Sequence, residues 1–162
     1  MNRARLRLGR HSRIGHSYIL TTVTHGRRRY FDDPNAAQVV MDVLHRIDTE
    51  GLTQSLAYVV MPDHIHWLVE LRAFSLDYIM QRFKSSSALQ VNRMLGQSGR
   101  FWQSSCHDHA IRSDESLFRH AMYVLGNPIR AGVTTQLGEY SHAWCRWNMD
   151  GTLRSLDDPA SV

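Results

Sequence analysis

The sequence predicts an α+β fold, in which an antiparallel sheet carries helices on one face, and three observations lead to this prediction. Short segments rich in β-branched and aromatic residues are expected strands, and segments with apolar residues at helical spacing are expected helices. The two kinds follow one another in the order β-α-β-β-α-β, with a further helix behind them. This order is typical of the ferredoxin-like, or RRM-like, arrangement.

The limits of the elements follow from capping and turn residues. The expected strands are Ser17–Thr24, Leu56–Met61, His64–Leu71 and a short His109–Arg112. Each expected helix begins directly after a capping residue, which is Asp33, Ser75 or Ser113. The first two helices end near the glycines Gly51 and Gly96. The third must end near Asn127, because a proline follows it and disfavours helical backbone in the residue before it.

The length of 162 residues suits a single domain with its own core. We expect one folded domain over residues 16–149, a basic arm at 1–15 and a loose tail at 150–162. No apolar run approaches the length of a membrane span and no signal peptide is recognisable, so a cytoplasmic protein is expected. Cys106 and Cys145 lack the spacing of a metal site and are expected to be ordinary packing residues.

Positive charge is concentrated at the start of the chain. Residues 1–30 carry eight arginines and no acid, so the remainder must be net negative if the whole chain sums to +4. The candidate DNA-binding residues are Arg3, Arg5, Arg7, Arg10, Arg13, Arg27, Arg28 and Arg29. Arginine pairs with phosphate and with guanine edges. This concentration favours a nucleic-acid partner over the alternative, a solubilising tail.

Two His-x-His triplets are candidate metal sites. Alternation along a strand places His64 and His66 on one face of the sheet and turns Ile65 to the other. Two imidazoles rooted in a sheet form a rigid half of a metal site. A second triplet, His107-Asp108-His109, has the same spacing. Spacing alone does not choose between them.

The third expected helix has a polar face with an unusual tyrosine. At about 100° per residue, five residues fall within roughly 60° of a common line. They are Ser116, Arg119, His120, Tyr123 and Asn127. The opposite side is apolar and is the natural core face. A tyrosine among such neighbours is either a nucleophile or an amphipathic surface residue.

Four segments, in this order, resemble the single-tyrosine HUH transposases, and most closely their REP-associated tyrosine transposase branch. The segments are Met61-Pro62-Asp63-His64-Ile65-His66, Phe101-Trp102-Gln103, Asp108-His109 and Tyr123-Val124-Leu125-Gly126-Asn127-Pro128-Ile129-Arg130-Ala131-Gly132. The resemblance covers residues 15 to 147 and implies an HUH endonuclease type of fold.

The resemblance implies roles for individual residues. His64 and His66 match the family's metal-binding pair, Asn127 its third ligand and Tyr123 its nucleophile. Two imidazoles and an amide oxygen suit Mg²⁺ or Mn²⁺. Tyr123 would attack single-stranded DNA to form a 5′-phosphotyrosine.

The implied substrate is a REP palindrome that forms a hairpin beside a short guide tetranucleotide, and the branch acts as a monomer. His120 is either an auxiliary proton acceptor or a solvated helix residue. Lys84, on the second helix, is either a phosphate contact or part of a solvated face.

Two other functions remain open for this sequence. The first is a structured-DNA or RNA-binding protein that keeps the fold without turnover. The second is a metal-dependent hydrolase that uses His64, His66 and the auxiliary candidate Asp108 to activate water.

Overall fold

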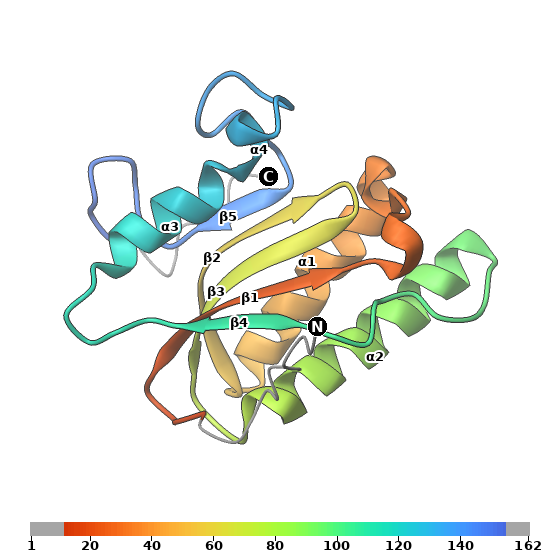
Figure 1. The fold of residues 1–162 in the computed structure, drawn as a ribbon, viewed down its shortest axis with the longest axis horizontal. Helices are drawn as coiled ribbons and strands as arrows, with labels where there is room; N and C mark the ends of the chain where they lie inside the picture. Colours follow the sequence, from red (N-terminus) through yellow and green to blue (C-terminus); the bar gives the residue numbers. More distant parts are fainter. Residues whose placement is uncertain (1–11, 155–162) are drawn as a thin grey trace, which may run out of the picture.

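The computed structural model describes residues 12–154 (Figure 1). The strands are β1 (Ser17–Val23), β2 (Thr53–Met61), β3 (His64–Leu71), β4 (His107–Ala110) and β5 (Ala143–Cys145). The α-helices are α1 (Pro34–Thr49), α2 (Leu76–Leu95), α3 (Leu117–Leu125) and the single turn α4 (Asn127–Arg130). Two short 3₁₀ turns, η1 (His25–Arg27) and η2 (Tyr30–Asp32), connect β1 to α1.

The strands form one antiparallel sheet in the order β4-β1-β3-β2-β5. The two strands that follow one another across the Pro62-Asp63 turn, β2 and β3, pair from Met61↔His64 to Thr53↔Leu71. β1 lies on the other side of β3, with Thr21 opposite His66. The predicted α+β fold with an antiparallel sheet is confirmed.

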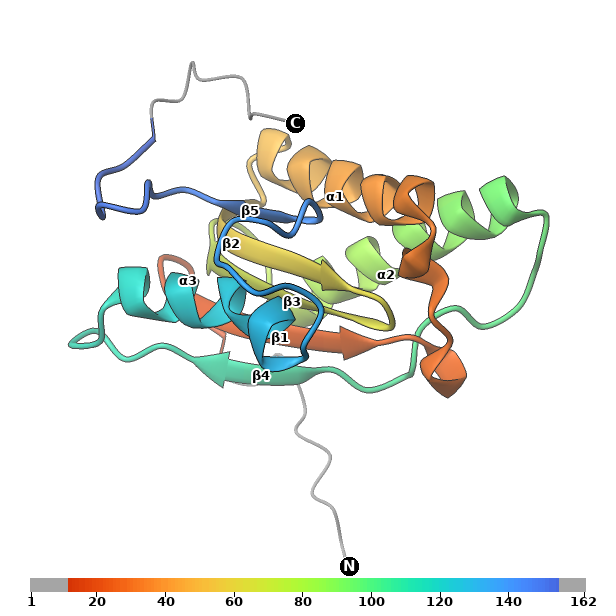
Figure 2. The same cartoon turned by 90° about the horizontal axis from the view of Figure 1, so that it is seen from above.

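The helices cover both faces of the sheet, and the prediction of helices on one face is wrong in this respect. α1 and α2 pack on the face that carries Ile65, Trp67 and Val69. α3 packs on the other face through Ala121 and Val124. Figure 2 shows the sheet between the two helical layers. The reason lies in β2 and β3, whose residues are apolar on both sides, so that the second face also requires a cover.

Capping residues placed α1 and α2 correctly. The Asp33 side chain accepts a hydrogen bond from the Asn35 amide, and the Ser75 hydroxyl accepts one from the Tyr78 amide. α2 ends at Gly96, whose φ of 63° is left-handed backbone.

Several limits differ from the predictions, and β2 begins at Thr53 rather than at Leu56. α3 begins at Leu117, behind Ser116 rather than Ser113, because the Ser116 hydroxyl accepts from the Arg119 amide. The helix ends at Leu125, and Asn127 opens α4 instead of closing α3. β4 starts two residues earlier than expected, because its pairing with β1 begins at His107. β5 was not predicted.

Parts of both expected terminal segments contact the domain. At the N-terminal end, the Arg13 amide donates to the Tyr18 hydroxyl and Gly15 pairs with Leu71. Within the expected loose tail, the Arg154 amide donates to the Arg146 carbonyl, which closes a turn over residues 146–154. The remaining residues of the arm and tail, 1–11 and 155–162, lie outside the described part of the chain.

Two smaller expectations concern the cysteines and membranes. Cys106 and Cys145 are buried and unpaired with each other, as expected for packing residues. Within residues 12–154, no helix combines the length and the apolar character needed to cross a bilayer.

Candidate active site

Both histidines of the first triplet are held from behind by other side chains. Nδ1 of His64 lies 2.6 Å from the Asp63 carboxylate, and Nδ1 of His66 lies 2.9 Å from the Thr21 hydroxyl. The two rings are perpendicular, with centroids 4.9 Å apart. In the tautomer whose Nδ1–H donates to these partners, the Nε2 atoms are left to bind a ligand. This is the arrangement by which metal-binding histidines are oriented.

The charges around the pair favour neutral imidazole at His66. Burial, together with the positive charges of His64 and Arg130, lowers the pKa of His66 to about 4. Burial acts to raise the pKa of Asp63, but the hydrogen bond with His64 and the charges of His64 and Arg27 outweigh it and lower that pKa. His64 is therefore hydrogen-bonded to an ionised Asp63, and the neighbouring imidazole of His66 is neutral. A metal ion requires neutral imidazole ligands.

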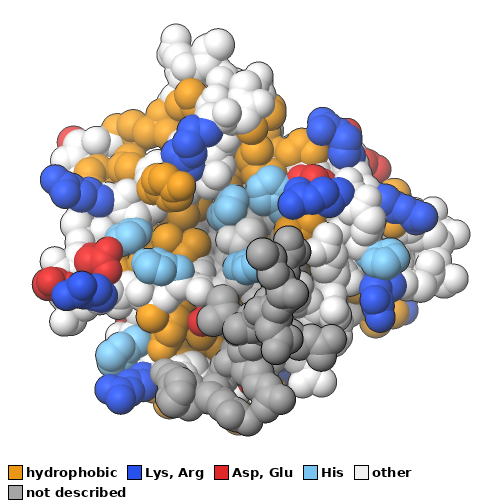
Figure 3. Space-filling model, viewed as in Figure 1, with side chains coloured by type: hydrophobic (Ala, Val, Ile, Leu, Met, Phe, Trp, Pro, Cys, Tyr) orange, Lys and Arg blue, Asp and Glu red, His pale blue; other side chains and the backbone are white. Residues whose placement is uncertain are grey.

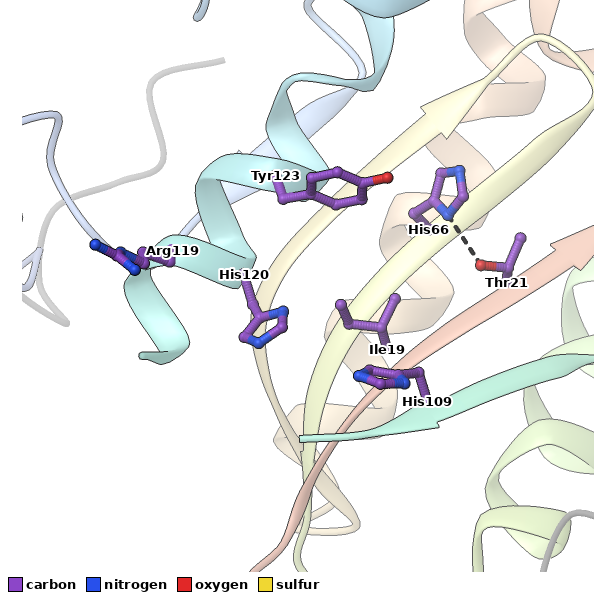
Figure 4. A pocket seen from close by; sticks show the side chains of 7 residues that line it. All are labelled: Ile19, Thr21, His66, His109, Arg119, His120 and Tyr123. Carbon is purple, nitrogen blue, oxygen red and sulfur yellow. Dashed lines mark hydrogen bonds between the residues drawn. The ribbon is translucent and has the colours of Figure 1, made fainter. Parts of the chain in front are cut away.

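Tyr123 is presented to solvent on the polar face of α3. It is 61% exposed, whereas Ala121 and Val124 on the other side of the helix are buried in the sheet. Figure 4 shows its hydroxyl directed towards His66 across the face of the sheet. The helical analysis therefore placed the tyrosine on the correct side of α3.

Arg130, which received no role from the sequence, fixes the position of Tyr123. Its guanidinium carbon lies 4.0 Å from the centroid of the Tyr123 ring, a cation–π contact, and its Nη2 donates to the Tyr123 carbonyl. The backbone of Gly126 passes close beneath it, and a Cβ at Gly126 would lie 2.7 Å from Nη1 of Arg130. Both Gly126 and Arg130 belong to the Tyr123–Gly132 segment. They come into contact because the chain changes direction between α3 and α4.

A pocket of about 490 Å³ joins Tyr123 to the sheet. Its lining residues come from β1, β3, β4 and α3, and they are Ile19, Thr21, His66, His109, Arg119, His120 and Tyr123. The surface view shows histidine side chains gathered on this face, beside hydrophobic and basic side chains (Figure 3). The structure thus brings the predicted nucleophile and one predicted metal ligand to the same recess.

The His120 side chain is not directed towards the Tyr123 hydroxyl. The two side chains leave α3 in different directions, and His120 lies near His109 (Figure 4). Nε2 of His120 lies 2.8 Å from the Glu115 carboxylate, whose other oxygen accepts from the Arg112 amide. The sequence had not connected Glu115 with this histidine.

Strand register separates Asp108 from the first triplet. Thr21 is opposite both His66 and His107, so these three residues share the face that α3 covers. Asp108 is opposite Leu20, which belongs to the core under α1 and α2. The structure does not bring Asp108 together with His64 and His66.

Asn127 is half-buried at the start of α4. Its Nδ2 donates to the Val124 carbonyl, which leaves the amide oxygen as the atom able to bind a cation. Asn127 does not line the pocket with Tyr123. Among the described residues, no group of three or more His, Cys, Asp and Glu side chains is arranged to hold a metal ion.

The basic candidates have different surroundings. Lys84 is half-buried on α2, where its ammonium donates to the carbonyls of Gln103 and Ser105, and burial lowers its pKa. Arg27, Arg28 and Arg29 are exposed at the end of β1. Arg27 lies 3.4 Å from Asp63, the partner of His64, so this loop borders the histidine pair.

Arg13 is exposed at the start of the described chain. The other arm candidates, Arg3, Arg5, Arg7 and Arg10, lie outside the described residues.

The greater part of the chain matches a known family. Residues 12–115, well over half of the chain, match the family model described as "Transposase IS200 like". The chain belongs to the IS200-like transposase family. The matched segment includes His64 and His66 and ends before Tyr123.

An individual relative carries a related name. A Haemophilus influenzae protein named as a REP-associated tyrosine transposase is 26% identical over 101 residues, which are 56% of this chain and 57% of that protein. The chain therefore spans little more than half the length of this relative. The resemblance to REP-associated tyrosine transposases is confirmed by this match.

Two solved structures share the fold. A REP-associated tyrosine transposase bound to a REP hairpin superposes with a TM-score of 0.69 at 20% identity, over 85% of this chain and 81% of the other. A Deinococcus radiodurans R1 transposase gives a TM-score of 0.52 at 21% identity, over 74% and 95%. These matches support the antiparallel α+β architecture of the transposase.

Proposed function

We propose that this IS200-like transposase cleaves and rejoins single-stranded DNA through a covalent tyrosine intermediate of the HUH class. The observation that carries the proposal is the pocket that Tyr123 shares with His66, with the tyrosine hydroxyl directed towards the histidine. A positioned nucleophile beside a pair of ligating imidazoles is the combination that phosphoryl transfer requires.

The reaction conserves the phosphodiester energy. The Tyr123 oxygen loses its proton and attacks the scissile phosphorus, and the bond from phosphorus to the 3′ oxygen of the upstream strand breaks. The upstream strand leaves with a 3′-hydroxyl, and the phosphate stays on the 5′ end of the downstream strand, joined to Tyr123. Attack by a 3′-hydroxyl on that linkage reverses the step and rejoins DNA.

The residues present fit a divalent cation. His64 and His66 offer Nε2 atoms, because their Nδ1 atoms are engaged with Asp63 and Thr21, and the free amide oxygen of Asn127 would be the third donor. Nitrogen and amide oxygen donors without a thiolate suit Mg²⁺ or Mn²⁺. Such an ion supplies Lewis acidity to the scissile phosphate when bound. Arg130 and Arg27 add fixed positive charge near the histidine pair, because the charge of Arg130 acts on His66 and Arg27 pairs with Asp63.

The substrate we propose is a REP-type hairpin with a single-stranded flank. Both the Haemophilus influenzae relative and the hairpin-bound structure carry the REP-associated name. The exposed loop from Arg27 to Arg29 offers phosphate contacts next to the site. Such a reaction takes place in the cytoplasm, on the DNA of the nucleoid.

We propose that one chain forms a complete site. His66 and Tyr123 of the same chain line the same pocket, which supports catalysis in cis by a monomer. A mixture of Tyr123→Phe chains with His66→Ala chains should then remain inactive. Restored cleavage in the mixture would show that the tyrosine is donated between chains.

The test of the function uses the position of a label in the DNA. A hairpin substrate labelled at its 3′ end should transfer the label to a denaturation-resistant protein adduct, while a 5′-labelled copy should release a shorter strand ending in a 3′-hydroxyl. Chelation of divalent ions should prevent both. Binding without cleavage would indicate a DNA- or RNA-binding protein on this fold. Cleavage without an adduct, retained in Tyr123→Phe, would indicate a hydrolase.

A further inference from the structure

The pocket beside Tyr123 has a second end, which lies apart from the Tyr123 hydroxyl. Tyr123 and His66 lie at one end, and the other lies between the edge strand β4 and the first turns of α3 (Figure 4). This second end, the histidine end, consists of Ile19, His109 and His120. At about 490 Å³ the whole pocket is within the range of small-molecule sites, roughly 300–1,000 Å³.

His120 is held in place by a carboxylate that is itself held by the backbone. Its Nε2–H donates to one oxygen of Glu115 over 2.8 Å, and the other Glu115 oxygen accepts from the Arg112 amide over 3.0 Å. The Arg112 amide and the His120 hydrogen bond lower the pKa of Glu115, so the carboxylate remains ionised. The ring orientation is therefore fixed, and Nδ1 is the nitrogen left for another partner.

His109 forms the opposite wall and Ile19 the floor. The rings of His109 and His120 have centroids 6.3 Å apart and are inclined by 42°. Ile19 is opposite His109 in the sheet and is packed against the core beneath α3. The result is an apolar floor between two flat rings with polar edges, and none of the described residues that line the pocket is an acid.

This combination suits a nucleobase. Bases stack on aromatic rings, including imidazole, and their edges form hydrogen bonds with ring nitrogens. Glu115 is hydrogen-bonded to His120 and does not line the pocket, so a negatively charged ligand in the pocket contacts the imidazole rings and not this carboxylate. The same recess opens on Tyr123 and His66, and a phosphate attacked by Tyr123 carries one nucleotide on each side of it.

Resting on the proposed function, we propose that the histidine end is a subsite for the base of a nucleotide that adjoins the scissile phosphate. His109 and His120 hold this base, and through it they place the phosphate against Tyr123. The role differs from proton transfer, because His120 points away from the Tyr123 hydroxyl (Figure 4).

The first test is a double-mutant cycle between protein and DNA. Cleavage rates are measured for wild type and His120→Ala on a hairpin substrate in which each nucleotide near the cut is made abasic in turn. At the nucleotide that occupies the subsite, losing the base and losing the ring should each slow cleavage by about 5- to 150-fold, the range of base stacking, and the combination should cost no more than either. His120→Phe, which keeps a flat ring, should restore part of the rate. Additive losses at every position would overturn the proposal.

The second test does not require cleavage. Histidine-labelled protein is titrated by NMR with thymidine 5′-monophosphate, with deoxyadenosine 5′-monophosphate and with inorganic phosphate, at millimolar concentrations. Either nucleotide, but not phosphate, should shift the resonances of His109 and His120, assigned from His109→Ala and His120→Ala. His45, exposed on α1 behind the sheet, is the control and should not shift.

Equal shifts with inorganic phosphate, or no shift with either nucleotide, would overturn the base subsite. Absence of a covalent adduct in the wild type would instead contradict the proposed function. The titration distinguishes the two failures.

Discussion

The two faces of the sheet are built from the same strands but differ in burial: one is fully packed, and the other carries the partly exposed candidate site. On β3, Ile65 and Trp67 are 1% and 0% exposed beneath α1 and α2. Their neighbours His64 and His66 turn to the other face, where they keep partial exposure. α3 covers that second face only in part, through Ala121 and Val124, and leaves Tyr123 exposed at its margin.

The difference shows how a site is kept rigid while its groups remain free. We call the face beneath α1 and α2, which carries Ile65 and Trp67, the closed face, and the face that carries His64 and His66 the open face. Close packing on the closed face immobilises β3, and the backbone of β3 then fixes the positions from which both imidazoles project. Asp63 and Thr21 orient the rings without covering them. If this division holds, changes on the open face remove activity without unfolding the protein, and changes on the closed face unfold it.

The largest effect on the open face is expected at Tyr123. Tyr123→Phe should reduce cleavage and adduct formation to background, because no other atom replaces the attacking oxygen. Hairpin affinity and thermal stability should stay close to wild type, since the side chain is exposed. Tyr78→Phe, an exposed tyrosine on α2, is the matched control and should keep full adduct formation. Cleavage by Tyr123→Phe at the wild-type rate would remove the tyrosine from the mechanism.

The histidine pair should follow. His66→Ala or His64→Ala should lower metal-dependent cleavage by about 10²–10³-fold or more, the scale of losing one preorganised electrostatic contact to a transition state. The melting temperature should change little. His107→Ala, on the same face one strand beyond Thr21, serves as the control and should retain most activity. An essential His107 beside a dispensable His66 would show that the other triplet binds the metal.

Trp67 tests the closed face directly beside the pair. Trp67→Ala should cost about 3–5 kcal/mol of unfolding free energy in a denaturant titration, because it empties a fully buried site. It also leaves the Ser55 hydroxyl without the indole N–H that donates to it over 2.8 Å. Trp67→Phe, which keeps most of the volume, should cost markedly less. A small loss in Trp67→Ala would contradict the division between the faces.

Arg130 should produce a smaller effect on the open face. Arg130→Gln should slow adduct formation by about 10-fold at unchanged hairpin affinity, because the cation–π contact and the bond to the Tyr123 carbonyl both disappear. Gly126→Ala tests the same contact differently, since its Cβ displaces the guanidinium and keeps the charge. Arg93→Gln, exposed on α2, is the control. Full activity in both Arg130→Gln and Gly126→Ala would show that the contact is dispensable.

The sequence predicted what local residues determine. Asp33 with Pro34, Ser75 and Gly96 set the limits of α1 and α2, and alternation along β3 separated the histidines from Ile65. The helical periodicity also placed Tyr123 opposite Ala121 and Val124. Each of these results depends on residues within a few positions of one another.

Interactions between distant segments could not be predicted in this way. β5 has three residues and no pattern of its own, and it forms because β2 offers a free edge. Thr21 and His66 are 45 positions apart, so only the sheet register reveals their hydrogen bond. The strand residues of the second sheet face are apolar in the sequence, but the sequence did not reveal that α3 packs on this face. The roles expected for Tyr123 and Asn127 come from the family resemblance, because the sequence pattern alone left them open.

The smallest effect is expected from the basic arm at residues 1–15, most of which is outside the described part of the chain. Ser12 accepts a hydrogen bond from the Leu76 amide and the Arg13 amide donates one to the Tyr18 hydroxyl, so a deletion of residues 2–11 removes four arginines and spares these two hydrogen bonds. Hairpins that carry the single-stranded flank should lose more affinity than bare hairpins, because arginine reads guanine edges as well as phosphate. The slope of log affinity against log salt should flatten by up to about 0.7–0.9 for each phosphate that the arm no longer neutralises. Equal losses on both DNAs would make the arm a non-specific electrostatic anchor, and no loss on either would make it a solubilising tail. In every case Tyr123 and the histidine pair remain in place, so the cleavage rate of saturated substrate should be close to that of the wild type.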